Sequence, residues 1–219
     1  MHILYLYGFA SGPQSNKAQF FKEKFNSLDV PFDIFDYIPN RESFSNLKTS
    51  KLLENLHSYI ELNYTKETDI VLFGSSFGAF LSVWYTSKHP ERVQNLILIA
   101  PALRFSAHLI CETHGINPSL WEKQGLINVF HYRYNGEIPL KYTFYEDLVE
   151  NPLPDFDKVG ISIPILILHG KSDNVVPIIG SKQFADSNRQ VTLHELNGDH
   201  QLLDQKDAMW DLVKDFLGI

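Results

Sequence analysis

Short apolar runs alternate with helical patterns along the whole chain, and this rhythm constrains the fold more than any other feature of the sequence. An apolar run bounded by glycine, proline or polar residues is typical of a strand that is covered on both faces. Strands separated by helices are joined by crossovers, which makes them parallel. The expected strands are residues 3–7, 32–35, 70–73, 96–100, 163–168 and 191–196. We therefore predict an α/β fold, a three-layer, doubly wound and mainly parallel sheet of about six strands with helices on both faces.

The segments between these strands carry apolar residues at helical spacing. Helices are expected over residues 14–28 and 47–60, after residue 76 as far as His89, from near Pro177, and around residues 209–216. A chain of 219 residues fits one packed domain better than two, and it shows no repeat or linker. We expect a single domain over residues 1–219.

One long stretch, approximately residues 103–157, breaks the alternation of strand and helix. Its helical signals are weaker, and it is rich in aromatic residues: Trp121, Phe130, Tyr132, Tyr134, Tyr142, Phe144 and Tyr145. Insertions at the carboxyl ends of parallel strands overhang the ligand crevice. We predict a small helical lid here. A peripheral helical hairpin that only covers the sheet is the alternative.

Charge and cysteine content exclude several classes of protein. The net charge of -7 argues against a nucleic-acid partner, which needs a basic face. The single cysteine allows no intrachain disulfide. No apolar run approaches the ~20 residues of a membrane span, and no Lys or Arg precedes Lys17 to form the basic start of a signal peptide. We expect a soluble, cytoplasmic protein without a membrane span, and nothing indicates a homo-oligomer.

The segment 74–78, Gly-Ser-Ser-Phe-Gly, matches G-x-S-x-G. Chance alone yields this pattern in roughly one chain in fifteen. Here it lies between a strand pattern and an amphipathic helix, the setting in which a nucleophile elbow presents a serine. The glycines are centred on Ser76, which makes it the candidate nucleophile. Ser75 is the neighbouring alternative, with a structural role expected.

A serine hydroxyl needs a histidine to take its proton and a carboxylate to orient that histidine. In this kind of fold the chain order is serine, acid, histidine. Asp173 lies in the loop after strand 163–168, and His200 follows strand 191–196, so we predict them as acid and base. Asp199 and Asp204 are alternative carboxylates, but both are close to His200 in sequence.

A tetrahedral intermediate also needs two N–H donors for its oxyanion. We expect one from Phe77, which follows the nucleophile, and one from Phe9 in the loop after the first strand, with Ala10 as the fallback. No cofactor is expected, because neither G-x-G-x-x-G nor a P-loop occurs. The group His108, Cys111, Glu112 and His114 has the residue types of a metal site. His114 does not share a helical face with the others, so no metal is expected.

With these residues in place, the chain resembles the α/β-hydrolase superfamily throughout, from Gly8-Phe9 through the elbow and HGKSDNVVP to GDHQLLD. It is more narrowly similar to a family of small bacterial serine esterases, mostly without an assigned activity, that have a short helical lid. The stretch from APALRF through the aromatic insertion also resembles the lid-bearing members. That family usually has histidine before the first glycine, where this chain has Tyr7. We interpret the Tyr7 hydroxyl as a hydrogen-bonding group of this loop or as a pocket residue.

The predicted function is serine-dependent hydrolysis of carboxylic esters with small to medium apolar acyl groups, through an acyl-enzyme. The substrate would be a small-molecule ester. The alternatives are an acyl-thioesterase or protein deacylase, and a ligand-binding protein that keeps the fold without turnover. Amide cleavage is less favoured, because no extra group to protonate an amine leaving group is evident.

Overall fold

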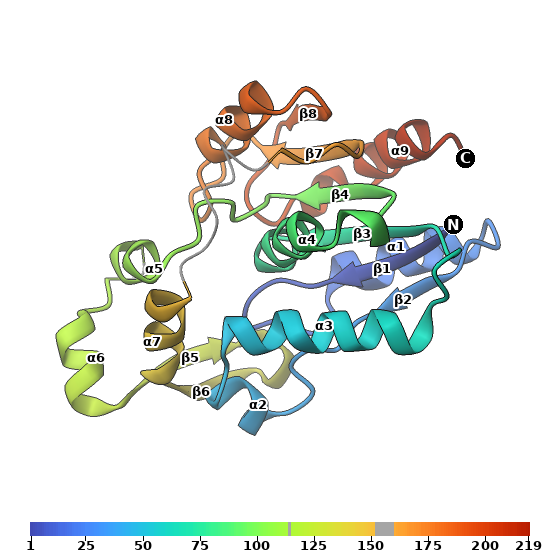
Figure 1. The fold of residues 1–219 in the computed structure, drawn as a ribbon. Helices are drawn as coiled ribbons and strands as arrows, with labels where there is room; N and C mark the ends of the chain where they lie inside the picture. The colour runs from blue at the N-terminus through green and yellow to red at the C-terminus, as the bar shows by residue number, and fades with distance from the viewer. Residues whose placement is uncertain (114, 152–159) are drawn as a thin grey trace.

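The computed structural model describes residues 1–113, 115–151 and 160–219. Within them, a six-stranded sheet has the order β2-β1-β3-β4-β7-β8, and all its neighbouring strands are parallel (Figure 1). The strands are β1 His2–Leu6, β2 Phe32–Ile34, β3 Ile70–Ser75, β4 Asn95–Ile99, β7 Ile165–Gly170 and β8 Val191–Leu196. The predicted α/β fold is confirmed, and each predicted strand corresponds to an observed one within two residues at either end.

Helices cover both faces of this sheet. One face carries α1 and α9, which contact each other, and the other carries α3 and α4 (Figure 1). The helices that pack around the sheet are α1 Asn16–Asn26, α3 Thr49–Asn63, α4 Phe77–Lys88, α8 Ile179–Ser187 and α9 Lys206–Leu217. The short α2 Arg41–Ser45 contacts the strand Gly136–Lys141 instead. Within the described residues, no helix has both the length and the apolar character that a bilayer crossing requires.

The middle of the sheet forms the core. Every residue of β3 and β7 is buried, as expected for parallel strands that are packed on both faces. The edge strand β8 is only half-buried, and its residues Thr192 and Glu195 are exposed. Aromatic side chains fill the layer under α1 and α9, where the Phe25 ring lies edge-on to Trp210 with centroids 4.9 Å apart. The fully buried centre fixes the positions of the loops at the carboxyl ends of the strands.

The insertion between β4 and β7 extends beyond the carboxyl ends of the sheet strands (Figure 1). It contains α5 Ala107–Thr113, α6 Pro118–Gln124, β5 Leu126–His131, β6 Gly136–Lys141 and α7 Thr143–Glu150. The helices were expected, but the antiparallel β5–β6 hairpin was not. Burial alternates along β6, where Ile138 and Leu140 are buried between exposed neighbours. The last part of the predicted insertion, residues 152–157, lies outside the described residues.

Candidate active site

Ser76 lies in a sharp turn between β3 and α4, and its backbone is in the left-handed region with φ 54°. Two glycines permit this turn. A methyl group at Gly74 would lie 2.4 Å from the Ala79 Cα, and one at Gly78 would lie 2.1 Å from the Leu6 carbonyl oxygen. Both distances are far shorter than carbon contacts allow, so the close approach of β1, β3 and α4 requires glycine at both positions. The G-x-S-x-G pattern therefore has a steric basis in this fold.

The three residues predicted as nucleophile, base and acid form one chain of hydrogen bonds. The Ser76 hydroxyl lies 3.1 Å from His200 Nε2, and His200 Nδ1 donates to Asp173 Oδ2 over 2.8 Å. The side chain of Asp173 is fully buried and that of His200 is 12% exposed. With its proton on Nδ1, His200 is left with a free lone pair on Nε2, which faces the serine hydroxyl.

The loops that carry the acid and the histidine are packed tightly against each other. A methyl group at Gly170, the last residue of β7, would lie 2.4 Å from the Asp199 carbonyl oxygen. Lys17 of α1 is buried beneath the histidine loop, where its Nζ donates to the Gln201 carbonyl over 3.1 Å. Burial lowers the pKa of Lys17 to about 8, partly offset by the charges of Asp173 and Asp199.

Asp173 is held by four hydrogen bonds. Its Oδ1 accepts from the N–H groups of Val175 (2.9 Å) and Val176 (2.7 Å). Its Oδ2 accepts from His200 and from His169 Nε2, which is 3.1 Å away. Burial on its own would raise the pKa of Asp173, but the bonds from His169, His200 and Val176 outweigh it and hold the pKa well below the usual range. The carboxylate is therefore ionised throughout the neutral range.

His169 was not among the residues that the sequence singled out. It is the fifth residue of β7 and is fully buried. The available signal was its position near the end of the strand, four residues before Asp173. The alternative carboxylate Asp199 instead caps its own loop, where its Oδ1 accepts from the N–H groups of Gln201 and Leu202. Asp204 lies in a short 3₁₀-helix, Leu203–Gln205, and is exposed.

The two predicted oxyanion donors belong to segments that adjoin Ser76. Phe77 is the first residue of α4, where a backbone N–H has no partner in its own helix. Phe9 follows Gly8, at which a methyl group would touch the Ser76 Cβ at 3.5 Å. In the part of the chain that the structure describes, neither the Phe9 nor the Phe77 N–H donates to another protein group, and the same is true of the fallback, Ala10. An oxyanion hole requires N–H groups without such a partner.

The Tyr7 side chain is fully buried. Its hydroxyl donates to Asp36 Oδ1 over 2.6 Å and accepts from the Ile38 N–H over 3.0 Å. The interpretation that this hydroxyl binds within its own loop or lines a pocket is therefore wrong, because its partners follow β2 instead. Arg133 of the hairpin turn also binds Asp36, at 3.0 Å from both carboxylate oxygens. Tyr7 thus anchors the end of β1 to a network that reaches the insertion.

We expect Tyr7→Phe to lower the free energy of unfolding by about 1–3 kcal/mol, because the buried Ile38 N–H loses its acceptor. The matched control is Tyr132→Phe, whose side chain is 70% exposed and whose loss should change stability by less than about 0.5 kcal/mol. Urea unfolding of both variants measures the difference. Equal stability of the two variants would show that the Tyr7 hydroxyl does not anchor the loop.

No metal centre is evident at the residues singled out by the sequence. Across the described residues, no group of three or more His, Cys, Asp or Glu side chains is placed to hold a metal ion. His108 and Glu112 are exposed and 4.0 Å apart, whereas Cys111 is buried. His114 lies outside the described residues. The geometry gives no support to metal-dependent chemistry at this cluster.

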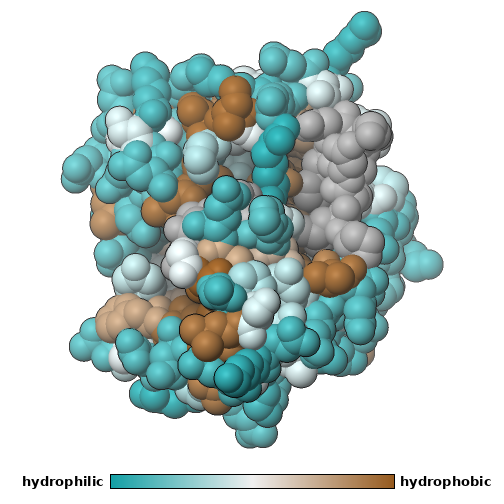
Figure 2. Space-filling model, turned by 90° about the vertical axis from the view of Figure 1, so that its left-hand side faces the viewer, coloured by the Kyte–Doolittle hydropathy of each residue, from teal (hydrophilic) through white to brown (hydrophobic). Residues whose placement is uncertain are grey.

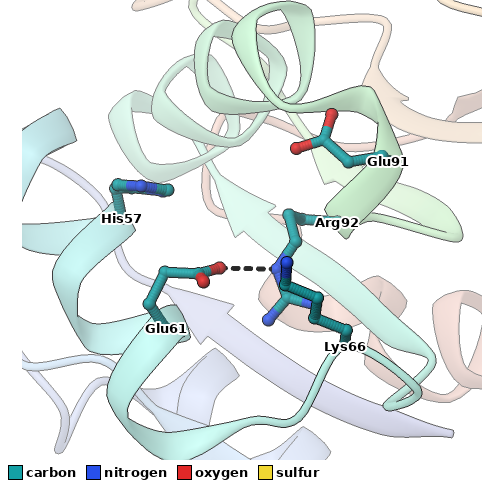
Figure 3. Close-up of a pocket in the computed structure, with 5 residues that line it drawn as sticks. All are labelled: His57, Glu61, Lys66, Glu91 and Arg92. Atoms are coloured by element: carbon teal, nitrogen blue, oxygen red, sulfur yellow. Dashed lines mark hydrogen bonds and ion pairs between the residues drawn. The ribbon is translucent and has the colours of Figure 1, made fainter.

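A cavity of about 350 Å³ lies near the C-terminal end of α4, whereas Ser76 precedes the N-terminal end of that helix. Figure 3 shows this cavity with the side chains that line it. Its lining residues are His57, Glu61, Lys66, Glu91 and Arg92. The buried Arg92 side chain donates to Glu61 over 2.7 Å and to the carbonyls of Tyr64 and Thr65, so its guanidinium group ties α3 to the turn after α4. The helix α4 has 12 residues. At a rise of 1.5 Å per residue it separates the cavity from Ser76 by about 18 Å. The cavity is therefore not part of the Ser76 site.

Comparison with known proteins places the chain in a family. A family model described as "Uncharacterised protein family (UPF0227)" matches residues 2–217. The chain belongs to this family. The UPF0227 chain is also 28% identical, over 94% of its length and 70% of the other protein, to mouse "Palmitoyl-protein thioesterase ABHD10, mitochondrial".

Solved structures share the fold of this UPF0227 chain. Mouse alpha/beta hydrolase domain-containing protein 10 superposes with a TM-score of 0.80 at 24% identity, covering 99% of this chain and 89% of that one. Est1E of Butyrivibrio proteoclasticus, solved with ferulic acid bound, gives a TM-score of 0.77 at 17% identity, with 99% and 88% covered. The likeness to these structures shows that the chain has the α/β-hydrolase fold.

Proposed function

We propose that this protein is a serine hydrolase of carboxylic esters with small to medium apolar acyl groups. The observation that carries the proposal is the continuous hydrogen-bond chain from Ser76 through His200 to the ionised Asp173. A serine hydroxyl alone is a poor nucleophile at neutral pH, and this arrangement supplies both the base that activates it and the anion that stabilises the resulting imidazolium.

The proposed reaction has two steps. Ser76 Oγ attacks the acyl carbon while its proton passes to His200 Nε2, and the N–H groups of Phe9 and Phe77 stabilise the oxyanion. His200 then returns the proton to the leaving alcohol. Water, deprotonated by the same nitrogen, attacks the acyl-enzyme, and His200 returns that proton to Ser76 Oγ as the acid is released. No cofactor takes part.

Aromatic side chains beside the nucleophile support an apolar acyl group. The Phe77 ring lies 5.9 Å from that of Phe9 and 4.8 Å from that of Phe105. Phe144 of α7 completes the cluster at 5.9 Å from Phe9. Phe9 and Phe105 remain half-exposed, so both rings can contact a substrate at this end of the molecule. Figure 2 views the same end, where brown apolar patches are scattered among polar side chains.

We further propose that the protein is a single domain and that the insertion covers this site. Its hairpin turn is bound to the oxyanion loop, since the Tyr132 N–H donates to the Ala10 carbonyl over 2.9 Å. A methyl group at Gly12 would lie 2.8 Å from the Arg133 Cδ, which shows how closely this turn packs on the loop. The cytoplasmic location stays a prediction from the sequence.

An acyl-thioesterase is the second candidate, supported by the name of the mouse relative that aligns with 94% of this chain. The test combines labelling by a fluorophosphonate with turnover of p-nitrophenyl esters of graded chain length and of thioesters with the same acyl groups. We expect labelling, and the highest kcat/KM on esters of short to medium acyl chains. A clear preference for the thioesters would favour the second candidate. No labelling and no turnover would leave a ligand-binding protein.

A further inference from the structure

His169 contacts the proposed acid but no position that a substrate would occupy. Its Nε2 lies 3.1 Å from Asp173 Oδ2 and 2.9 Å from the Val176 carbonyl oxygen. A carboxylate and a carbonyl only accept hydrogen bonds, so Nε2 carries a proton that is shared between them. On the other side of the ring, Nδ1 lies 2.8 Å from the Ser181 hydroxyl. The side chains of His169 and Ser181 are fully buried, and these contacts leave the His169 ring with one orientation.

The carboxylate oxygen that binds His169 is the same oxygen that binds His200. Asp173 Oδ2 therefore divides its negative charge between two imidazole N–H groups, at 3.1 Å and 2.8 Å. A second donor on a carboxylate oxygen weakens its attraction for the first. The His169 donor also helps to fix the orientation of the carboxylate. It holds Oδ2, while the N–H groups of Val175 and Val176 hold Oδ1.

We propose that His169 is a positioning residue that acts through Asp173, fixing the carboxylate and setting the pH at which His200 becomes able to accept the Ser76 proton. This inference rests on the proposed function, because it concerns the same hydrogen-bond chain. Without the His169 donor, Oδ2 would bind the His200 imidazolium more strongly. The histidine would then keep its proton to higher pH, and fewer enzyme molecules would be active in the acidic range.

Two other charged groups near this site are Lys17 and Asp199. Lys17 faces Asp173 and Asp199 from α1, and its pKa of about 8 places its titration on the alkaline side. Asp199 is bound to the backbone of its own loop and does not contact His200 through its side chain in the described structure. A displacement of the acidic limb of the pH profile therefore reports on the groups that bind Asp173.

The test is the pH dependence of kcat/KM for a p-nitrophenyl ester with the full-length protein. His169→Asn removes the donor at the Nε2 position and keeps an amide near Ser181. In this variant we expect the acidic limb of the pH profile, where kcat/KM rises with pH, to move to higher pH by about half a unit to one unit. We expect kcat to fall about three- to tenfold in the same variant. His169→Gln, whose amide reaches the Nε2 position, should restore the wild-type limb.

Ser181→Ala is the matched control, since it removes the Nδ1 partner and leaves the bond to Asp173. It should lower thermal stability without moving the limb. If His169→Asn does not fold, His169→Phe takes its place. If a folded variant without the donor keeps the wild-type acidic limb, the inference about His169 is overturned, but the proposed function is not. If neither variant folds, His169 has a structural role only, and the inference is also overturned. A wild-type protein that is not labelled by the fluorophosphonate would instead overturn the proposed function, and the inference with it.

Discussion

Ser76→Ala should abolish fluorophosphonate labelling and lower kcat for a p-nitrophenyl ester by about 10⁴-fold or more. The change removes the oxygen that lies 3.1 Å from His200 Nε2, and no acyl-enzyme can form without it. The fold should persist, because alanine keeps the Cβ of serine and the backbone N–H still donates to the Ile99 carbonyl over 2.8 Å. Thermal unfolding of the variant within a few degrees of the wild type would confirm that only the chemistry is lost.

The matched control for this experiment is Ser75→Ala. Ser75 is the neighbouring serine of the same motif, is buried at the end of β3, and its side chain lies against the Tyr5 hydroxyl. We expect labelling to remain and kcat to change less than tenfold, on the scale of an indirect effect. Labelling that persists in Ser76→Ala and disappears in Ser75→Ala would move the nucleophile by one residue. Labelling that persists in both would point to a site elsewhere.

The strands could be predicted from the sequence because the centre of a parallel sheet leaves a local signature. Burial on both faces makes each strand a continuous apolar run, and β3 and β7 are buried at every position. The β5–β6 hairpin left a weaker signature. It has one buried and one exposed face, its loop has Asn135 in the left-handed region at φ 46°, and its strand β6 contains Pro139. A proline inside a run argues against a strand unless the strand is at an edge, as it is here.

The candidate site divides in the same way between local and distant information. Ser76, Asp173 and His200 each follow a strand, so chain order and turn composition were enough to select them. The partners of His169 and Tyr7 could not be selected like this. Tyr7 binds Asp36, which binds Arg133 from a hairpin far along the chain, and such contacts appear only when the fold is assembled. Residues that support a site but belong to no sequence motif can therefore be identified only from the structure.

Asp173→Asn should lower kcat/KM by about 10⁴-fold while the protein stays folded. The asparagine oxygen can keep the two backbone N–H bonds of Val175 and Val176, which turns its NH₂ group toward His200 and His169. An NH₂ group donates, so His200 Nδ1 would have to accept and its proton would move to Nε2. That nitrogen faces Ser76 and could no longer take the serine proton. Steady-state kinetics at pH 7–8 measure the loss.

Asp199→Asn is the control that separates this effect from a general loss of charge beside the histidine. Asp199 precedes His200 directly, but its Oδ1 caps the loop by accepting from the N–H groups of Gln201 and Leu202. An asparagine oxygen can accept the same two bonds, so we expect kcat/KM to fall less than tenfold. If Asp173→Asn kept activity within tenfold of the wild type and Asp199→Asn lost it, the acid would be the residue beside the histidine. The buried carboxylate after β7 would then serve only to hold its loop.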